Sequence, residues 1–146
     1  MCFIYREKVE TMDQNKLNNL LTAAYEARAN SYSPYSKFAV GCAILLKDNT
    51  VIKGVNIENA AYGVVLCAER SAMAAVISQG QQANIAAIAV ATDASPLGSP
   101  CGMCRQFLSE FLLPHTPIVF GNGKNESQLT NITELLPFAF NKSALE

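Results

Sequence analysis

Three cysteines and one glutamate stand at spacings that suit a catalytic metal site. Glu69 follows Cys67 by two residues, and Cys101 and Cys104 form a Cys-x-x-Cys pair directly after Pro100. Three thiolates can hold a Zn²⁺ ion and leave its fourth tetrahedral position open, as catalytic rather than structural zinc sites do. Metal-activated water also needs a nearby base that takes and returns its proton, and Glu69 has the right type and position for it. The four residues predict a hydrolytic zinc site.

Each part of this pattern also has a simpler interpretation. A single cysteine on an alanine-rich helix, as at Cys67, is usually a small buried hydrophobic residue. A Cys-x-x-Cys pair by itself can be half of a zinc ribbon, or a redox dithiol when it lies between a strand and a helix. Glu69 alone would usually be a solvated helix residue. The combination favours the catalytic zinc, while a cytosolic redox protein and a zinc-stapled interaction module stay open as alternatives.

The hydrophobic pattern predicts the elements that position these motifs. Helices are expected to run from Asp13 to before Pro34, over 67–78 with Gly80 as a C-cap candidate, after Pro100, and over 132–136. Strands are expected over 39–46, 51–57, 85–91 and 117–120, with a hairpin through 47–50 and a turn at 121–123. A hairpin followed by alternating strands and helices fits an α/β domain, with helices on both faces of a mixed sheet.

In this arrangement Cys67 and the Cys101/Cys104 pair lie at helix N-termini. The partial positive charge and free N–H groups there lower the pKa of a thiol and stabilise the thiolate. Three thiolates around Zn²⁺ still sum to a net negative charge, which weakens the metal as a Lewis acid. Arg70, one turn after Cys67, is expected to offset this charge by hydrogen bonding to the sulfurs.

The length and charge of the chain limit the classes of function that it can have. The chain has 146 residues, half of them hydrophobic, and a formal net charge of −1. We expect one domain over 1–146, in which 1–12 form a loose N-terminal arm because they show no periodicity. The lack of a Lys/Arg-rich run argues against nucleic acid as a partner, and no apolar run reaches the length of a membrane span. We therefore expect a cytoplasmic protein, in which five cysteines favour metal or catalytic use over disulfides.

The cysteine pattern resembles that of the zinc deaminases, whose signature reads H-x-E and then P-C-x-x-C, with cysteine allowed as the first ligand. Beyond that signature, the chain resembles the small homotetrameric cytidine deaminases of pyrimidine salvage. The matching segments arrive in the family's order and are 32–38, 56–62, 67–70, 99–106 and 135–140. The departures are Ala39 for a frequent proline, Cys42 for a small residue, and an N-terminal arm without a counterpart.

This resemblance implies a three-layer α-β-α fold with a mixed five-stranded sheet, and one zinc ion per chain held by Cys67, Cys101 and Cys104. Glu69 would take a proton from water, deliver it to N3 of the cytosine ring, and carry a second proton to the leaving amino group. By the same resemblance, the Ala68 N–H would meet the ring O2, and the Ser99 carbonyl would accept from the amine.

The resemblance also implies a nucleoside pocket. Asn56 and Glu58 lie two apart at a strand end and so share a face, which suits binding of the ribose 3′-OH, although a solvated strand end is the simpler interpretation. Phe38 would stack on the base; composition alone favours a core aromatic. In the homotetramer, neighbouring subunits would close the pocket with Ala60, Tyr62 and Phe140, although the sequence alone favours a Phe140 that packs on its own domain.

Free cytidine and 2′-deoxycytidine are the expected substrates. A carboxylate near the sugar repels a phosphate, so Glu58 predicts little activity on the monophosphate. The nearest alternative is a deaminase of the same chemistry that acts on an aminated pyrimidine antibiotic or on polynucleotide. The Asn56 and Glu58 pair favours free nucleosides over both.

Overall fold

The computed structural model describes residues 12–124 and 126–145, so the expected N-terminal arm lies outside the described residues except for Met12. The helices and strands follow in the order α1 (Gln14–Ala27), β1 (Gly41–Leu46), β2 (Val51–Val55), α2 (Ala68–Ser78), β3 (Ile85–Thr92), α3 (Gly102–Ser109), β4 (Pro117–Asn122), β5 (Ser127–Asn131) and α4 (Ile132–Leu135). In the described part of the chain, none of the helices combines the length and hydrophobicity that crossing a membrane requires.

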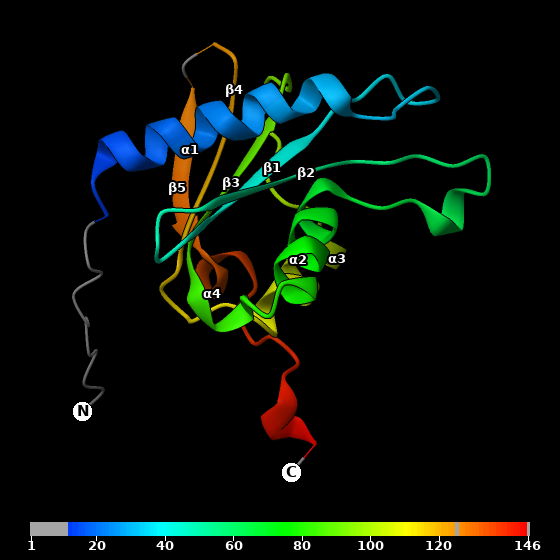
Figure 1. Ribbon diagram of the computed structural model, residues 1–146. Helices are drawn as coiled ribbons and strands as arrows, with labels where there is room; N and C mark the ends of the chain where they lie inside the picture. Colours follow the sequence, from blue (N-terminus) through cyan, green and yellow to red (C-terminus); the bar gives the residue numbers. More distant parts are fainter. Residues whose placement is uncertain (1–11, 125, 146) are drawn as a thin grey trace.

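The strands form one five-stranded mixed sheet in the order β2-β1-β3-β4-β5 (Figure 1). Only the central pair β3 and β4 is parallel, and the other three neighbouring pairs are antiparallel. A crossover through α3 joins the parallel pair, as parallel neighbours require. The predicted mixed sheet and the hairpin between β1 and β2 are therefore confirmed.

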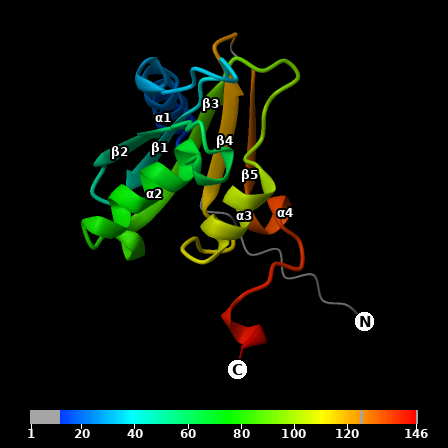
Figure 2. The same ribbon diagram turned by 90° about the vertical axis from the view of Figure 1, so that its right-hand side faces the viewer.

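Helices cover both faces of this sheet, which confirms the three layers. Figure 2 shows α1 on one side of the strands and α2 and α3 on the other. Asp13 caps α1 as predicted, because its side chain accepts a hydrogen bond from the Asn15 N–H. The buried stripe of α1 contains Leu17, Leu20 and Ala24, which recur at helical spacing and face the sheet.

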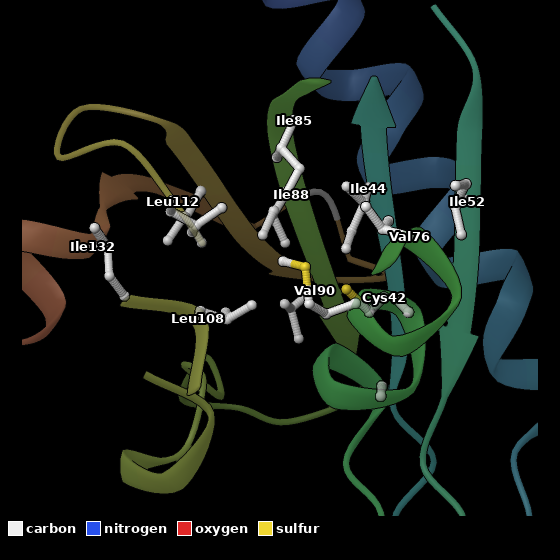
Figure 3. Packing of buried hydrophobic residues seen from close by; sticks show 14 of the residues in the cluster. Cys42, Ile44, Ile52, Val76, Ile85, Ile88, Val90, Leu108, Leu112 and Ile132 are labelled. Carbon is white, nitrogen blue, oxygen red and sulfur yellow. The ribbon is translucent and has the colours of Figure 1, made fainter. Parts of the chain in front are cut away.

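Side chains along β3 alternate between the two layers of the core. Ala87, Ala89 and Ala91 face α1, and their small size lets that helix lie close to the sheet. The larger Ile88 and Val90 point to the opposite face, toward α2 and α3 (Figure 3). All five are buried, as expected for a central strand covered on both faces. Cys42 on β1 joins the same cluster, which confirms it as a core residue.

Helix α2 packs closely against β2, and this contact fixes the position of the first turn of the helix. A Cβ atom at Gly54 would lie 2.4 Å from the Ala72 nitrogen, so only glycine allows this approach of helix to strand. The Ser71 hydroxyl, one turn into α2, accepts from the Val55 N–H at 3.0 Å and donates to the Val55 carbonyl at 2.9 Å. The first turn of α2 is thereby held beside the end of β2.

The structure corrects several predicted boundaries. Strand β5 lies at an exposed edge and has a polar sequence, so hydrophobic alternation gave no signal for it. Because β5 pairs with β4, Gly121 and Asn122 belong to β4 rather than to the expected turn. Helix α1 already ends at Ala27, well before Pro34. Gly80 ends α2 as predicted: it directly follows the last helical residues with a φ of +67°, its N–H donates to the Ile77 carbonyl at 2.9 Å, and the next N–H, of Gln81, donates to the Val76 carbonyl at 3.0 Å.

Candidate metal centre and substrate pocket

The three predicted metal-binding cysteines occupy the N-termini of two helices. Cys67 is the N-cap of α2, Cys101 is the N-cap of α3, and Cys104 lies in the first turn of α3. Their sulfur atoms all lie within 4.8 Å of one another. The two helices contact each other on the same face of the sheet, which brings together cysteines that are far apart in the sequence.

This donor set fits a zinc ion. Tetrahedral coordination with Zn–S bonds of about 2.3 Å places neighbouring sulfurs about 3.8 Å apart, and sulfurs that all lie within 4.8 Å of one another are close enough to share one ion. Three sulfurs use three of the four tetrahedral positions and leave one for a reactant. Cys67, Cys101 and Cys104 would hold the ion, and the described residues add no fourth ligand to this cluster.

The surroundings of Cys67 favour its thiolate form. A hydrogen bond from the Cys104 thiol and the neighbouring Arg70 guanidinium lower the pKa of Cys67 to about 5. The same contact with Cys67, together with burial, raises the pKa of the Cys104 thiol. The pair therefore shares a proton, which a bound cation displaces because metal ligation requires thiolates.

Glu69 is the one charged residue that is buried in the described part of the chain, with 4% of its surface exposed. Burial is the main cause that raises the pKa of its carboxyl, and the negative charge of Cys67 raises it further. Glu69 lines the same cavity as Cys67 and Cys101. A carboxyl whose pKa moves toward neutrality can both accept and return a proton, so the surroundings of Glu69 suit the predicted role.

Arg70 reaches back over the start of its helix. One terminal nitrogen donates to the Val65 carbonyl at 3.0 Å and contacts the Cys67 sulfur at 3.6 Å. Its Nε is buried and finds no hydrogen-bond partner among the described residues. The guanidinium is therefore placed against one sulfur, where sequence analysis expected it.

A cavity of about 770 Å³ opens beside the sulfurs, within the size range of small-molecule sites. Most predicted substrate-binding residues line it, namely Phe38, Asn56, Glu58, Tyr62, Ala68 and Ser99. The lining of this cavity does not include Ala60 or Phe140 in the described structure. Tyr62, expected to serve a neighbouring site, lies at the rim of the pocket of its own chain, 73% exposed and 6.0 Å from the Tyr35 ring.

The two predicted ribose-binding residues hold a loop of the pocket wall, 31–40. The side-chain oxygen of Asn56 accepts from the Val40 N–H at 2.8 Å, and its amide nitrogen donates to the Phe38 carbonyl at 2.8 Å. Glu58 accepts from the Ser36 hydroxyl and from the Tyr35 N–H at 2.9 Å. The Ser36 hydroxyl is the main cause that lowers the pKa of the Glu58 carboxyl, which therefore stays ionised.

Two further residues contribute to the pocket wall, and neither was predicted from the sequence. Ser36 both donates to Glu58 and accepts from the Phe38 N–H at 3.0 Å, so it sets the position of the aromatic ring. Thr92, at the end of β3, is buried and also lines the cavity. Ser36 lies inside a matched segment, 32–38, but a serine hydroxyl gives no signal of its role without the fold.

The chain is similar to known proteins over most of its length. The family described as "Cytidine and deoxycytidylate deaminase zinc-binding region" matches residues 14–120. The cytidine deaminase of Halalkalibacterium halodurans is 45% identical over 121 residues, which cover 83% of this chain and 91% of that protein. Blasticidin-S deaminase of Bacillus cereus is 32% identical over 115 residues, covering 74% and 81%. The crystal structure of cytidine deaminase from Burkholderia pseudomallei has a TM-score of 0.82 at 38% identity, covering 88% of this chain and all of that one.

These matches extend over most of the chain and include every element that carries the sulfur cluster and Glu69. The chain belongs to the cytidine and deoxycytidylate deaminase zinc-binding family. The fold, the zinc cofactor and the enzyme class that sequence analysis expected are thereby confirmed.

Replacing Arg70 tests its role at the sulfur cluster. In Arg70→Ala, loss of the positive charge should raise the pKa of Cys67 and lower the rate of the enzyme, with zinc retained or more weakly bound. Arg70→Lys keeps the positive charge but lacks the planar guanidinium, so its rate should lie between those of the wild type and Arg70→Ala. Turnover and zinc per chain are measured together, and an unchanged rate in Arg70→Ala would refute the role.

Proposed function

We propose that the chain hydrolyses free cytidine and 2′-deoxycytidine to uridine and 2′-deoxyuridine, with release of ammonia. One observation carries this proposal: a buried carboxyl, Glu69, lies beside three converging cysteine sulfurs in a cavity of nucleoside size. The redox alternative gives no role to Glu69, and a structural zinc site would use a fourth protein ligand. Free thiolates require a reducing compartment, which supports a cytoplasmic enzyme of pyrimidine salvage.

Glu69 carries the protons of this reaction. Cys67, Cys101 and Cys104 would hold a zinc ion, which would supply a Lewis acid that lowers the pKa of a water molecule. Glu69 takes a proton from that water and gives it to N3 of the ring as the water oxygen adds to C4. Glu69 then passes the second proton of the water to the amino group, the C4–N bond breaks, and ammonia leaves. One water is consumed, and the carboxylate is restored for the next cycle.

Backbone groups beside the cysteines orient the base. Ala68 is the first residue of α2, so its N–H is among the groups that have no partner inside the helix. We assign it to the ring O2. The Ser99 carbonyl, two residues before Cys101, is assigned to the amino group that leaves. Phe38, 46% exposed at the cavity wall, stacks on the ring.

The wild-type chain and Glu69→Gln together test the proposed reaction. The wild type should convert cytidine to uridine, seen as a change in ultraviolet absorbance and as ammonia release. Glu69→Gln should keep one zinc per chain but lose at least about 10²-fold in turnover, because the amide cannot carry a proton. A wild-type chain with zinc that leaves cytidine unchanged, or a fully active Glu69→Gln, would contradict the proposal.

Glu58 sets a preference for free nucleosides over nucleotides. Its pKa is lowered and it lines the cavity, so its negative charge opposes a phosphate on the sugar. Glu58→Gln should raise the activity on the monophosphate relative to cytidine by roughly three- to tenfold. Glu26→Gln on α1, at the opposite face of the sheet, is the charge-matched control and should leave the ratio unchanged. Comparable wild-type rates on cytidine and its monophosphate would refute this preference.

The similarity to blasticidin-S deaminase favours one second candidate, an aminated pyrimidine antibiotic as substrate. The chemistry at C4 would be the same, so the sulfur cluster and Glu69 do not discriminate between the two. The paired Asn56 and Glu58 side chains at the cavity wall support a ribose hydroxyl as ligand and therefore the free nucleoside. A higher kcat/KM for blasticidin S than for cytidine would favour the second candidate.

We propose in addition a homotetramer in which subunits share their sites. Phe138 is fully exposed, Phe140 is 61% exposed, and neither lines the cavity of its own chain as described. Exposed aromatic groups of this size are typical of protein interfaces. Ala60 is also exposed and lies outside the cavity wall. These observations support the contribution of Ala60, Tyr62 and Phe140 to neighbouring sites.

Co-expression of two inactive variants tests the shared site. Glu69→Gln lacks the proton carrier, and Phe140→Ala lacks the aromatic group that a neighbour should supply. In mixed tetramers, some sites combine the intact Glu69 of one chain with the intact Phe140 of another. Activity should then exceed the sum of the two separate variants. Activity equal to that sum, or a fully active monomer in dilute solution, would rule out shared sites.

A further inference from the structure

Arg105 uses all three of its guanidinium nitrogens on groups around the metal-binding turn. Nε donates to the Pro100 carbonyl at 2.7 Å, one terminal nitrogen donates to the Ser99 hydroxyl at 2.7 Å, and the other donates to the Leu135 carbonyl at 2.8 Å. The side chain is half-buried between α3 and the end of α4. These three acceptors are uncharged, and Arg105 forms no ion pair with a carboxylate of the described residues.

The position of Arg105 in α3 explains why it can reach this turn. Its backbone N–H donates to the Cys101 carbonyl at 3.0 Å, so it lies one helical turn beyond the N-cap. From there the side chain extends back toward Ser99 and Pro100, the two residues that precede Cys101. The stretch from Asp93 to Pro100 contains neither helix nor strand. Arg105 therefore ties the end of an irregular loop to the helix that carries Cys101 and Cys104.

We propose that Arg105 is a positioning residue for deamination, which holds the Ser99 carbonyl in place for the leaving amino group. This inference rests on the proposed role of that carbonyl. A guanidinium fork fixes Ser99 and Pro100 at once, and a single ammonium group cannot reproduce three diverging hydrogen bonds. The hydrogen bond to Leu135 anchors the fork itself to the end of α4, which packs against α3, so the guanidinium is held from a second element.

Arg105 differs from Arg70 in what it touches. Arg70 contacts a cysteine sulfur, whereas the hydrogen bonds of Arg105 go to two carbonyls and one hydroxyl. Loss of Arg105 should therefore leave the affinity for zinc nearly unchanged. It should act on the step in which the amine is released, where the hydrogen bond to the Ser99 carbonyl is stronger than in the bound substrate.

Steady-state kinetics of Arg105→Ala and Arg105→Lys with cytidine test the inference. A misplacement of about 1 Å at a reacting group can cost 10²-fold in rate, so kcat should fall roughly a hundredfold in Arg105→Ala while KM changes little. Arg105→Lys should recover little of this loss. Guanidinium ion at non-denaturing concentration should restore part of kcat in Arg105→Ala, and methylammonium at the same concentration should not. Zinc should stay at one per chain throughout.

Two comparisons separate positioning from a general loss of stability. Phe111→Leu, beyond the other end of α3, disturbs the aromatic pair with Phe107 and should lower the melting temperature without lowering kcat. Ser99→Ala removes one acceptor of the fork. Its combination with Arg105→Ala should cost less than the product of the two single losses, because both remove the same hydrogen bond.

The possible outcomes distinguish this inference from the proposed function. An active wild type with an unchanged kcat in Arg105→Ala would overturn the inference alone. The inference would also be overturned if kcat fell only in proportion to a loss of zinc. The same holds if guanidinium ion failed to restore kcat in Arg105→Ala and Phe111→Leu showed the same loss of kcat. A zinc-loaded wild type that does not deaminate cytidine would refute the proposed function and, with it, this role.

Discussion

The convergence of three cysteine sulfurs at two helix N-termini is the constraint on which the rest of the structure depends. Each helix contributes a partial positive charge and free N–H groups to the same point, which offsets the negative charge of the thiolates. The helices reach this point because α2 is seated on β2 through Gly54, while α3 is the crossover between β3 and β4. The sheet order thus fixes the geometry of a site whose ligands stand in two distant parts of the chain.

The same helix starts place the acid–base group and the pocket. Glu69 lies in the first turn of α2, so the fold that aligns Cys67 also buries the carboxyl beside it and raises its pKa. The cavity is closed on another side by the loop 31–40, which is held by Asn56 and Glu58. These two side chains therefore shape the pocket through the backbone of the loop, in addition to the role proposed for them toward ribose.

Features that depend on residue type and on short spacing in the chain could be predicted from the sequence. The sulfur ligands, the buried position of β3 and the Asp13 cap follow from local patterns, and the structure contains each of them. Strand β5 escaped prediction because its sequence is polar and its pairing with β4 is a long-range contact. The roles of Ser36 and Arg105 depend on hydrogen bonds that form only after folding, several of them with backbone groups that any residue provides.

X-ray absorption at the zinc edge of the purified, fully metallated enzyme tests the central claim most directly. Three cysteine sulfurs and one open position predict a spectrum with three sulfur neighbours at about 2.3 Å and one lighter atom at about 2.0 Å. Four sulfurs would indicate a closed structural site, and the absence of sulfur neighbours would place the metal elsewhere. Either result would contradict the account.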